Sequence, residues 1–232
     1  MFRQHIDTAP IWEAYGTECE CPLCLLRAQC EASYVENFLG ASVMEPAVRM
    51  EVNEKGFCRE HLKMLYDTGN RLGLALMADT HLQECIRRLK EKPPTARRSF
   101  RGRTKPDTLV GDCILCARLD NTMERYLETL LYMWKKEPGF RESFKKSRGL
   151  CFPHYEALRD MAPTKMGRDG EAFLAALYEV TLTNMERMEE ELNWFTQKFD
   201  YRNRDKPWGT SADAVERALT KLRGGGPVPK KE

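Results

Sequence analysis

The stretches Cys21-Pro-Leu-Cys24 and Cys58-Arg-Glu-His61 set the organisation of this 232-residue chain, and 33 residues lie between Cys24 and Cys58. The same pattern recurs as Cys113-Ile-Leu-Cys116 and Cys151-Phe-Pro-His154, with 34 residues between its two parts. A gap of two residues lets both side chains of a pair turn onto one metal ion. The spacing predicts two four-ligand shells, one in each half of the chain: Cys21, Cys24, Cys58 and His61 in the first, and Cys113, Cys116, Cys151 and His154 in the second.

Three thiolates and one imidazole are the donors that tetrahedral zinc takes in structural sites. All four positions of each shell are filled by protein, so no position is left for water or substrate. The sequence therefore predicts two structural Zn²⁺ ions per chain. An iron–sulfur centre could use the same donors, and metal-free redox thiols are a further alternative.

The two halves resemble each other beyond the ligands. Tyr34 and Tyr126, the pairs Glu45-Pro46 and Glu137-Pro138, and Arg49 and Arg141 all recur at an offset of 92 residues. The offset becomes 93 at Cys151. This pattern indicates a tandem, pseudo-symmetric duplication of one unit, each copy stapled by its own Cys3His site.

Apolar residues recur every three or four positions, and no segment alternates as a strand does, so we expect an all-α fold. The prolines at 46 and 138 suit the first turn of a helix, and long helices are expected at about 71–91 and about 169–199, the latter following Ala162-Pro163. The expected organisation is an N-terminal unit at 1–91, a linker at 92–108, a C-terminal unit at 109–200, and a docking segment with a short helix and tail at 201–232. The apolar face expected for that short helix is Val215, Ala218, Leu219 and Leu222.

Composition narrows the class of protein. The chain has 37 Lys and Arg against 35 Asp and Glu, which argues against a strongly basic nucleic-acid-binding protein. No apolar stretch approaches the ~20 residues of a membrane span, and the N-terminus lacks the apolar core of a secretory signal. We therefore expect a cytoplasmic protein without a membrane partner. Nine Cys in a reducing compartment favour metal binding over disulfides.

The expected linker is rich in Pro and basic residues. Within it, Arg97, Arg98, Arg101 and Arg103 could contact the phosphates of a nucleic acid, with Phe100 available for stacking. A solvated linker that balances the acidic run at 186–191 is the favoured interpretation.

Four further residues could carry chemistry outside the predicted shells. His81 and Cys85 lie four residues apart, on one face of the expected long helix, and could form a ligand or redox pair. Cys19 could be a spare thiol or exchange with a neighbouring ligand, and Cys30 falls in a helical stripe. Burial within the core is the favoured interpretation of the His81 and Cys85 pair.

Several motifs together resemble a known family. They are the Cys-x2-Cys pairs, Glu-Pro-x-x-Arg, Ser147-Arg-Gly-Leu-Cys-Phe-Pro-His154, and the ending Phe199-Asp-Tyr-Arg-Asn-Arg-Asp-Lys-Pro-Trp-Gly209. The chain resembles one of the numbered bacterial families of unknown function that are common in anaerobic Firmicutes. The resemblance covers residues 15–223 and implies a bacterial, cytosolic protein.

The favoured function is a non-enzymatic, zinc-binding scaffold that holds an unknown protein or small ligand between its two units. No catalytic triad order, phosphate-binding loop or dinucleotide fingerprint is present, so an enzyme is less favoured. A thiol-based redox or metal sensor is the first alternative. Nucleic-acid binding through the linker is the weaker one.

Overall fold

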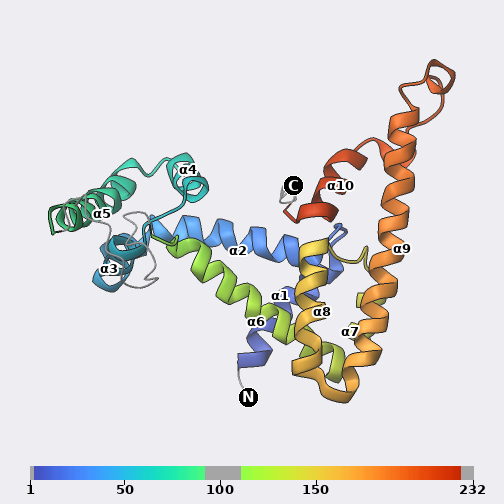
Figure 1. Ribbon diagram of the computed structural model, residues 1–232, viewed down its shortest axis with the longest axis horizontal. Helices are drawn as coiled ribbons and strands as arrows, with labels where there is room; N and C mark the ends of the chain where they lie inside the picture. Colours follow the sequence, from blue (N-terminus) through green and yellow to red (C-terminus); the bar gives the residue numbers. More distant parts are fainter. Residues whose placement is uncertain (1–2, 92–110, 226–232) are drawn as a thin grey trace, which may run out of the picture. The chain divides into compact units, whose positions relative to one another are not determined.

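The fold is all-α, as predicted. The computed structural model describes residues 3–91 and 111–225, with side chains from residue 7 onwards, and these ranges contain helices and no strand. Figure 1 shows the helices in chain order. The α-helices are α1 Arg3–Gly16, α2 Pro22–Phe38, α3 Pro46–Lys55, α4 Arg59–Asp67, α5 Arg71–Glu91, α6 Ile114–Lys136, α7 Pro138–Lys146, α8 Phe152–Met166, α9 Gly170–Gln197 and α10 Ala214–Arg223.

The local signals in the sequence explain most helix boundaries. Pro46 and Pro138 open α3 and α7, where the missing N–H costs no hydrogen bond. Gly56 ends α3 with a φ of 73°, a left-handed conformation that glycine adopts without strain. Asn70 caps α5, because its Oδ1 accepts a hydrogen bond from the backbone N–H of Gly73 at 2.9 Å.

Two boundaries differ from expectation. Helix α8 continues through Pro163 to Met166, so the turn before α9 comes later than Ala162-Pro163. Helix α1 was not predicted, and its sequence carries Pro10 inside the helix. Tertiary packing supports it nonetheless, since Ile11 is buried completely.

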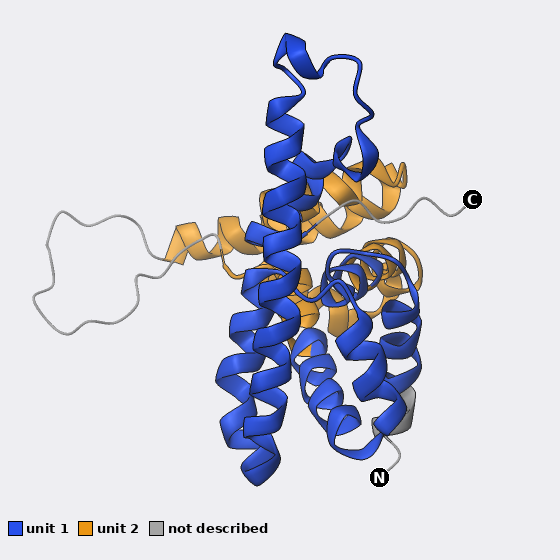
Figure 2. Ribbon diagram, turned by 90° about the vertical axis from the view of Figure 1, so that its right-hand side faces the viewer, with its two compact units in different colours: residues 1–29, 122–232 blue, residues 30–121 orange. Residues whose placement is uncertain are grey.

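The described chain divides into two compact units, coloured separately in Figure 2. Unit 1 comprises residues 1–29 and 122–232, and unit 2 comprises residues 30–121. Both divisions fall inside a helix, α2 and α6 respectively, rather than at a linker. The units therefore divide the chain differently from the expected 1–91 and 109–200. The expected linker at 92–108 lies outside the described residues.

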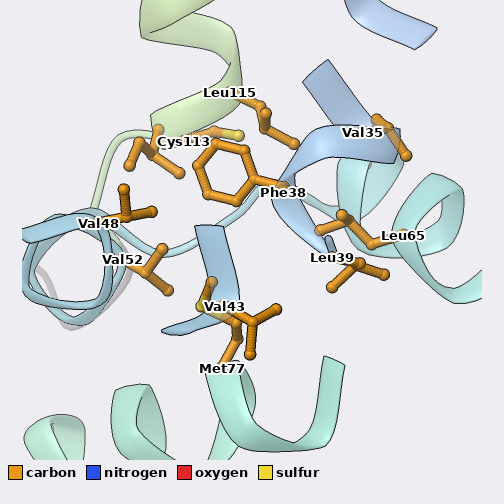
Figure 3. Packing of buried hydrophobic residues seen from close by; sticks show 11 residues of the cluster. Val35, Phe38, Leu39, Val43, Val48, Val52, Leu65, Met77, Cys113 and Leu115 are labelled. Atoms are coloured by element: carbon orange, nitrogen blue, oxygen red, sulfur yellow. The ribbon is translucent and has the colours of Figure 1, made fainter. Parts of the chain in front are cut away.

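Unit 2 has its own apolar core, shown in Figure 3. Phe38 at the end of α2 is 2% exposed and lies at an edge-to-face angle of 83° to Phe57, with ring centroids 5.7 Å apart. The core collects side chains from five helices and the short turn at 41–44: Val35, Phe38, Leu39, Val43, Val48, Val52, Leu65, Met77, Cys113, Ile114 and Leu115.

Unit 1 packs around aromatic rings. Phe144 of α7 contacts Trp134, Tyr15 and Phe173, with ring centroids 5.2–5.8 Å apart. These rings come from α1, α6, α7 and α9, so a few large side chains hold four helices together.

The C-terminal part of the chain folds onto α9. The indole N–H of Trp194 donates to the backbone oxygen of Pro207 at 3.2 Å. Lys198 Nζ donates to the backbone oxygens of Asn203, Arg204 and Lys206 at 2.5–3.0 Å. The Lys198 side chain thus donates hydrogen bonds to backbone oxygens of this turn, which would otherwise have to bond to water.

The buried face of α10 was predicted correctly only at Ala218, which is 6% exposed. Val215, Leu219 and Leu222 are 38%, 61% and 52% exposed, whereas the basic residue Lys221 is 1% exposed. Lys221 Nζ donates to the backbone oxygen of Glu20 at 2.8 Å and to that of Arg148, and it lies 3.4 Å from the Glu20 carboxylate. The packing of α10 within unit 1 therefore combines the buried ion pair of Lys221 with two small apolar residues, Ala214 and Ala218.

Replacing Lys221 tests this ion pair. Lys221→Met should lower the free energy of unfolding by about 2–4 kcal/mol, because the backbone oxygens of Glu20 and Arg148 lose their donor, while the Glu20 carboxylate keeps its arginine partners. Lys165→Met is the matched control, since Lys165 pairs with Glu128 while 51% exposed and should cost at most about 1 kcal/mol. Thermal and urea unfolding followed by circular dichroism measure both, and equal losses would contradict the expectation.

Candidate metal centres

All four predicted ligand pairs lie at the first turn of a helix. Cys58 and Cys151 are the N-cap residues of α4 and α8, and Cys21 and Cys113 directly precede α2 and α6. Each of these four cysteines accepts, on its backbone oxygen, the N–H of the residue four positions later, at 2.9–3.2 Å. The positive end of each helix dipole therefore faces a thiol group, which favours the thiolate form.

The structure groups these pairs differently from the prediction. One group, here called site A, contains Cys21, Cys24, Cys151 and His154, all in unit 1; the other, site B, contains Cys58, His61, Cys113 and Cys116, all in unit 2. The eight residues are those predicted, but the assignment of one shell to each half of the sequence is wrong. Each site joins a pair from the first half to a pair from the second.

The length of α2 explains the crossed pairing. Cys24 lies in the first turn of α2, whose 17 residues span about 25 Å. Phe57, which precedes Cys58, packs against Phe38 at the far end of that helix. Cys58 is therefore adjacent in sequence to a residue that packs at the last turn of α2, whereas Cys24 lies in the first turn, in agreement with their grouping in different sites.

The donor atoms of each site are spaced for a single ion. In site A, Cys151 Sγ lies 3.7 and 3.5 Å from the sulfurs of Cys21 and Cys24, and in site B the sulfurs of Cys58 and Cys116 lie 3.9 Å apart. The distances from sulfur to His Nδ1 are 3.1–3.4 Å. Ideal tetrahedral zinc, with bonds of about 2.3 Å to sulfur and about 2.0 Å to nitrogen, requires about 3.8 and about 3.5 Å. The geometry fits one tetrahedral ion in each site.

The pKa values of the four donor groups within each site differ. In site B, burial opposes ionisation of Cys113, but hydrogen bonds from His61 and from backbone N–H groups lower its pKa to about 6. Burial and the neighbouring Cys113 raise the pKa of Cys116 to about 12. In site A, the pKa of His154 rises to about 10, because the hydrogen bonds to Cys151 and Cys21 outweigh burial. The neighbouring thiols oppose one another's ionisation, and a bound cation would remove that opposition because it attracts every thiolate of the site.

Site B has an outer hydrogen-bond partner and a more accessible shell. His61 Nε2 lies 3.1 Å from the Glu31 carboxylate, so the ring can donate there while Nδ1 faces the thiols. A carboxylate in this position orients a ligating imidazole and increases its basicity. Cys58 and Cys116 are only partly buried, whereas all three cysteines of site A are buried.

The end of α10 covers site A. A Cβ placed on Gly224 would lie 3.5 Å from Cys24 Sγ and 3.6 Å from Cys151 Sγ. A pocket of about 450 Å³ adjoins the site and is lined in part by Cys19, Cys21 and Cys24. Its two arginines, Arg148 and Arg217, are already paired with Glu20. The pocket wall thus contains thiols and neutralised charges.

The four additional candidate residues lie outside both sites. Cys19 is partly buried beside site A, where burial and the neighbouring Cys21 raise its pKa to about 11. Cys30 lies partly buried in α2. His81 Nε2 lies 3.7 Å from Cys85 Sγ, while Nδ1 faces the backbone oxygen of Asn53 at 3.1 Å. Within the described ranges, no third metal-binding donor joins this pair.

The remaining predicted contacts are in the linker, and two residues near the sites were not predicted. The candidate nucleic-acid contacts Arg97, Arg98, Arg101 and Arg103 lie outside the described residues. Glu31 and Glu20 were missed by sequence reasoning. Glu31 is 30 residues from His61, so only the folded chain brings them together.

Comparison with known proteins gives a family without an assigned activity. The model of a family described as "Family of unknown function (DUF6062)" matches residues 2–229. A protein of Caldicellulosiruptor sp. (strain Rt8B.4), described as "Uncharacterized 23.9 kDa protein in xynA 3'region", is 22% identical over 187 residues, covering 80% of this chain and 85% of that protein. No solved structure matches. In the ranges the structure describes, no helix has the length and apolar character needed to cross a bilayer.

Proposed function

The chain belongs to DUF6062, a family of unknown function, and from its two Cys3His sites we propose a zinc-binding, non-enzymatic binding protein. Membership agrees with the family resemblance that the motifs indicate. In this proposal each Zn²⁺ holds together one compact unit, and the helices so fixed present surfaces to a partner. The identity of that protein or small ligand, its place between the units and a cytoplasmic location remain predictions.

The observation that carries the proposal is the closed ligand shell. Three thiols and one imidazole nitrogen surround each centre within 4.8 Å of one another, which suits one ion and fills its tetrahedral positions. A catalytic zinc keeps a position open for water or substrate. A multi-iron cluster binds each thiolate to an iron and would need sulfur atoms farther apart than 3.5–3.9 Å. The donor set therefore favours structural zinc.

Elemental analysis tests the metal assignment. Full-length protein purified without chelator should contain about two zinc per chain, and its visible spectrum should lack iron–sulfur absorption. Cobalt substitution should give the intense d–d bands of tetrahedral thiolate coordination at both sites. Stoichiometric iron, or a single zinc, would contradict the proposal.

A thiol-based sensor is the second candidate, and the partial exposure of Cys58 and Cys116 favours it at site B alone. Peroxide treatment followed by metal analysis separates the two functions. A scaffold should keep both ions at moderate peroxide, whereas a sensor should release the site B ion with disulfide formation. Nucleic-acid binding through the basic linker is weaker, and a salt-dependent gel shift tests it.

The carboxylate behind His61 gives a prediction specific to site B. Glu31→Gln should weaken metal binding at site B by about 10–100-fold, because the charged carboxylate that accepts from His61 Nε2 is replaced by a neutral and weaker amide acceptor. Glu36→Gln, an exposed residue on the same helix, is the matched control and should leave the affinity unchanged. Competition with a chromogenic chelator measures both. Equal affinities for the two variants would contradict this role of Glu31.

A further inference from the structure

Helix α5 has two apolar faces, and among the described residues of unit 2 only one of them is buried. The inner face carries Gly73 and Met77, which are buried. On the same side His81 and Arg88 hydrogen-bond to backbone oxygens of α3, at Asn53 and Glu54. This face therefore accounts for the packing of α5 within its own unit.

The other face carries a heptad pattern. Six exposed residues alternate at spacings of three and four over nearly the whole helix, and they are called the α5 seam below: Leu72, Ala75, Asp79, Leu82, Ile86 and Leu89. The four large apolar members are 72%, 60%, 42% and 51% exposed in chain order. A single surface leucine needs no explanation, but apolar residues repeating every 3.5 positions are the pattern by which one helix packs along another.

We propose that the α5 seam is the interface of a homodimer, in which α5 of a second copy of this chain packs against it. The sequences of the long segments outside the described ranges do not carry a pattern that matches the seam. Residues 92–110 are rich in Pro and basic residues and residues 226–232 include two prolines, and neither carries a heptad of leucines. A second copy does, and one stripe facing itself forms a closed, two-fold interface.

The residues of the seam favour an antiparallel pair. In a parallel pair Asp79 would face Asp79 and Ala75 would face Ala75, so two carboxylates would repel and two small side chains would leave a gap. Reversing one helix about the middle of the seam places Leu72 opposite Leu89, Ala75 opposite Ile86, and Asp79 beside Leu82. Gln83 Nε2 donates to the Asp79 carboxylate at 2.8 Å and can continue to do so at the edge of the interface.

The size of the seam limits the strength of the dimer. From Leu72 to Leu89 it spans about 26 Å on a helix about 10 Å wide. Two such strips cover about 520 Å² in projection, less than the roughly 1,200–2,000 Å² of stable interfaces, so the dimer should be weak and reversible. We therefore expect a dissociation constant in the micromolar range.

Sedimentation equilibrium of metal-loaded, full-length protein from about 1 to 200 µM tests the dimer. The wild type should show a reversible monomer–dimer equilibrium, Leu82→Glu should weaken it at least tenfold, and Asp79→Leu should strengthen it at least tenfold. Leu219→Glu changes a leucine of equal exposure, 61%, on α10 and should have no effect. Metal content and circular dichroism establish that each variant is folded.

Several results would overturn the proposal. The first is that both the wild type and Asp79→Leu remain monomeric at 200 µM. Another is a dimer that Leu82→Glu leaves intact. A monomer whose seam exchanges amide hydrogens slowly would place another part of the same chain on it. In a mixture of Ala75→Cys and Ile86→Cys chains, mass spectrometry should find the mixed disulfide, and a 75-to-75 disulfide alone would overturn the antiparallel arrangement.

Discussion

Cys24→Ser/Cys151→Ser should leave one metal ion per chain that survives a chelator wash, whereas Cys24→Ser/Cys58→Ser should leave none. The first double variant removes two thiolates from site A and leaves site B intact. The second removes one thiolate from each site, so both shells are left with three donors. Loss of a direct ligand should weaken binding by more than the 10–100-fold typical of an outer hydrogen-bond partner.

The same comparison distinguishes the crossed shells from shells within each half of the sequence. If Cys24 and Cys58 shared an ion, Cys24→Ser/Cys58→Ser would destroy one site and keep the other. Cys24→Ser/Cys151→Ser would then be the variant that loses both ions. The variants carry equal numbers of substitutions of the same kind, so general destabilisation cannot produce this difference. Metal content after the chelator wash, measured by mass spectrometry of the elements, is the required observation.

The ligands were predictable, but their partition was not. Spacing identifies Cys21 with Cys24 and Cys58 with His61 as local pairs, because a pair needs only one helical turn. Which pairs meet depends on where the helices carry them. Here Cys24 lies in the first turn of α2, whereas Phe57, next to Cys58, packs against Phe38 in the last turn of the same helix. Pairing by proximity in sequence fails when a rigid helix intervenes.

Helix boundaries were predictable where a single residue determines them, as at Pro46, Pro138 and Gly56. The apolar face of α10 was not predictable in this way, since Lys221 is buried only because Glu20 and two backbone oxygens receive it. The matching starts of α2 and α6, and of α3 and α7, keep the 92-residue offset. A duplication therefore remains a prediction at the level of these segments.

Removal of the site B ion should unfold unit 2. The core of this unit contains eleven buried residues, and Cys113, Ile114 and Leu115 among them come from the start of α6. Site B fastens that start to α4 through His61 and Cys58. Structural zinc supplies apparent binding free energies of about 10–16 kcal/mol, comparable with the 5–15 kcal/mol that typically stabilises a whole domain. A unit this small should not keep its fold without the ion.

Cys113→Ser should therefore lose the site B ion and expose the amides of α3, α4 and α5 to rapid hydrogen exchange. The helices around Phe144 in unit 1 should stay protected, because site A and the aromatic core of that unit remain intact. Cys85→Ser is the matched control: it makes the same change in the same unit, outside both shells, and should cost about 1 kcal/mol or less. Slow exchange persisting in α3–α5 of Cys113→Ser would mean that apolar packing alone maintains unit 2, and the ion would then need another role.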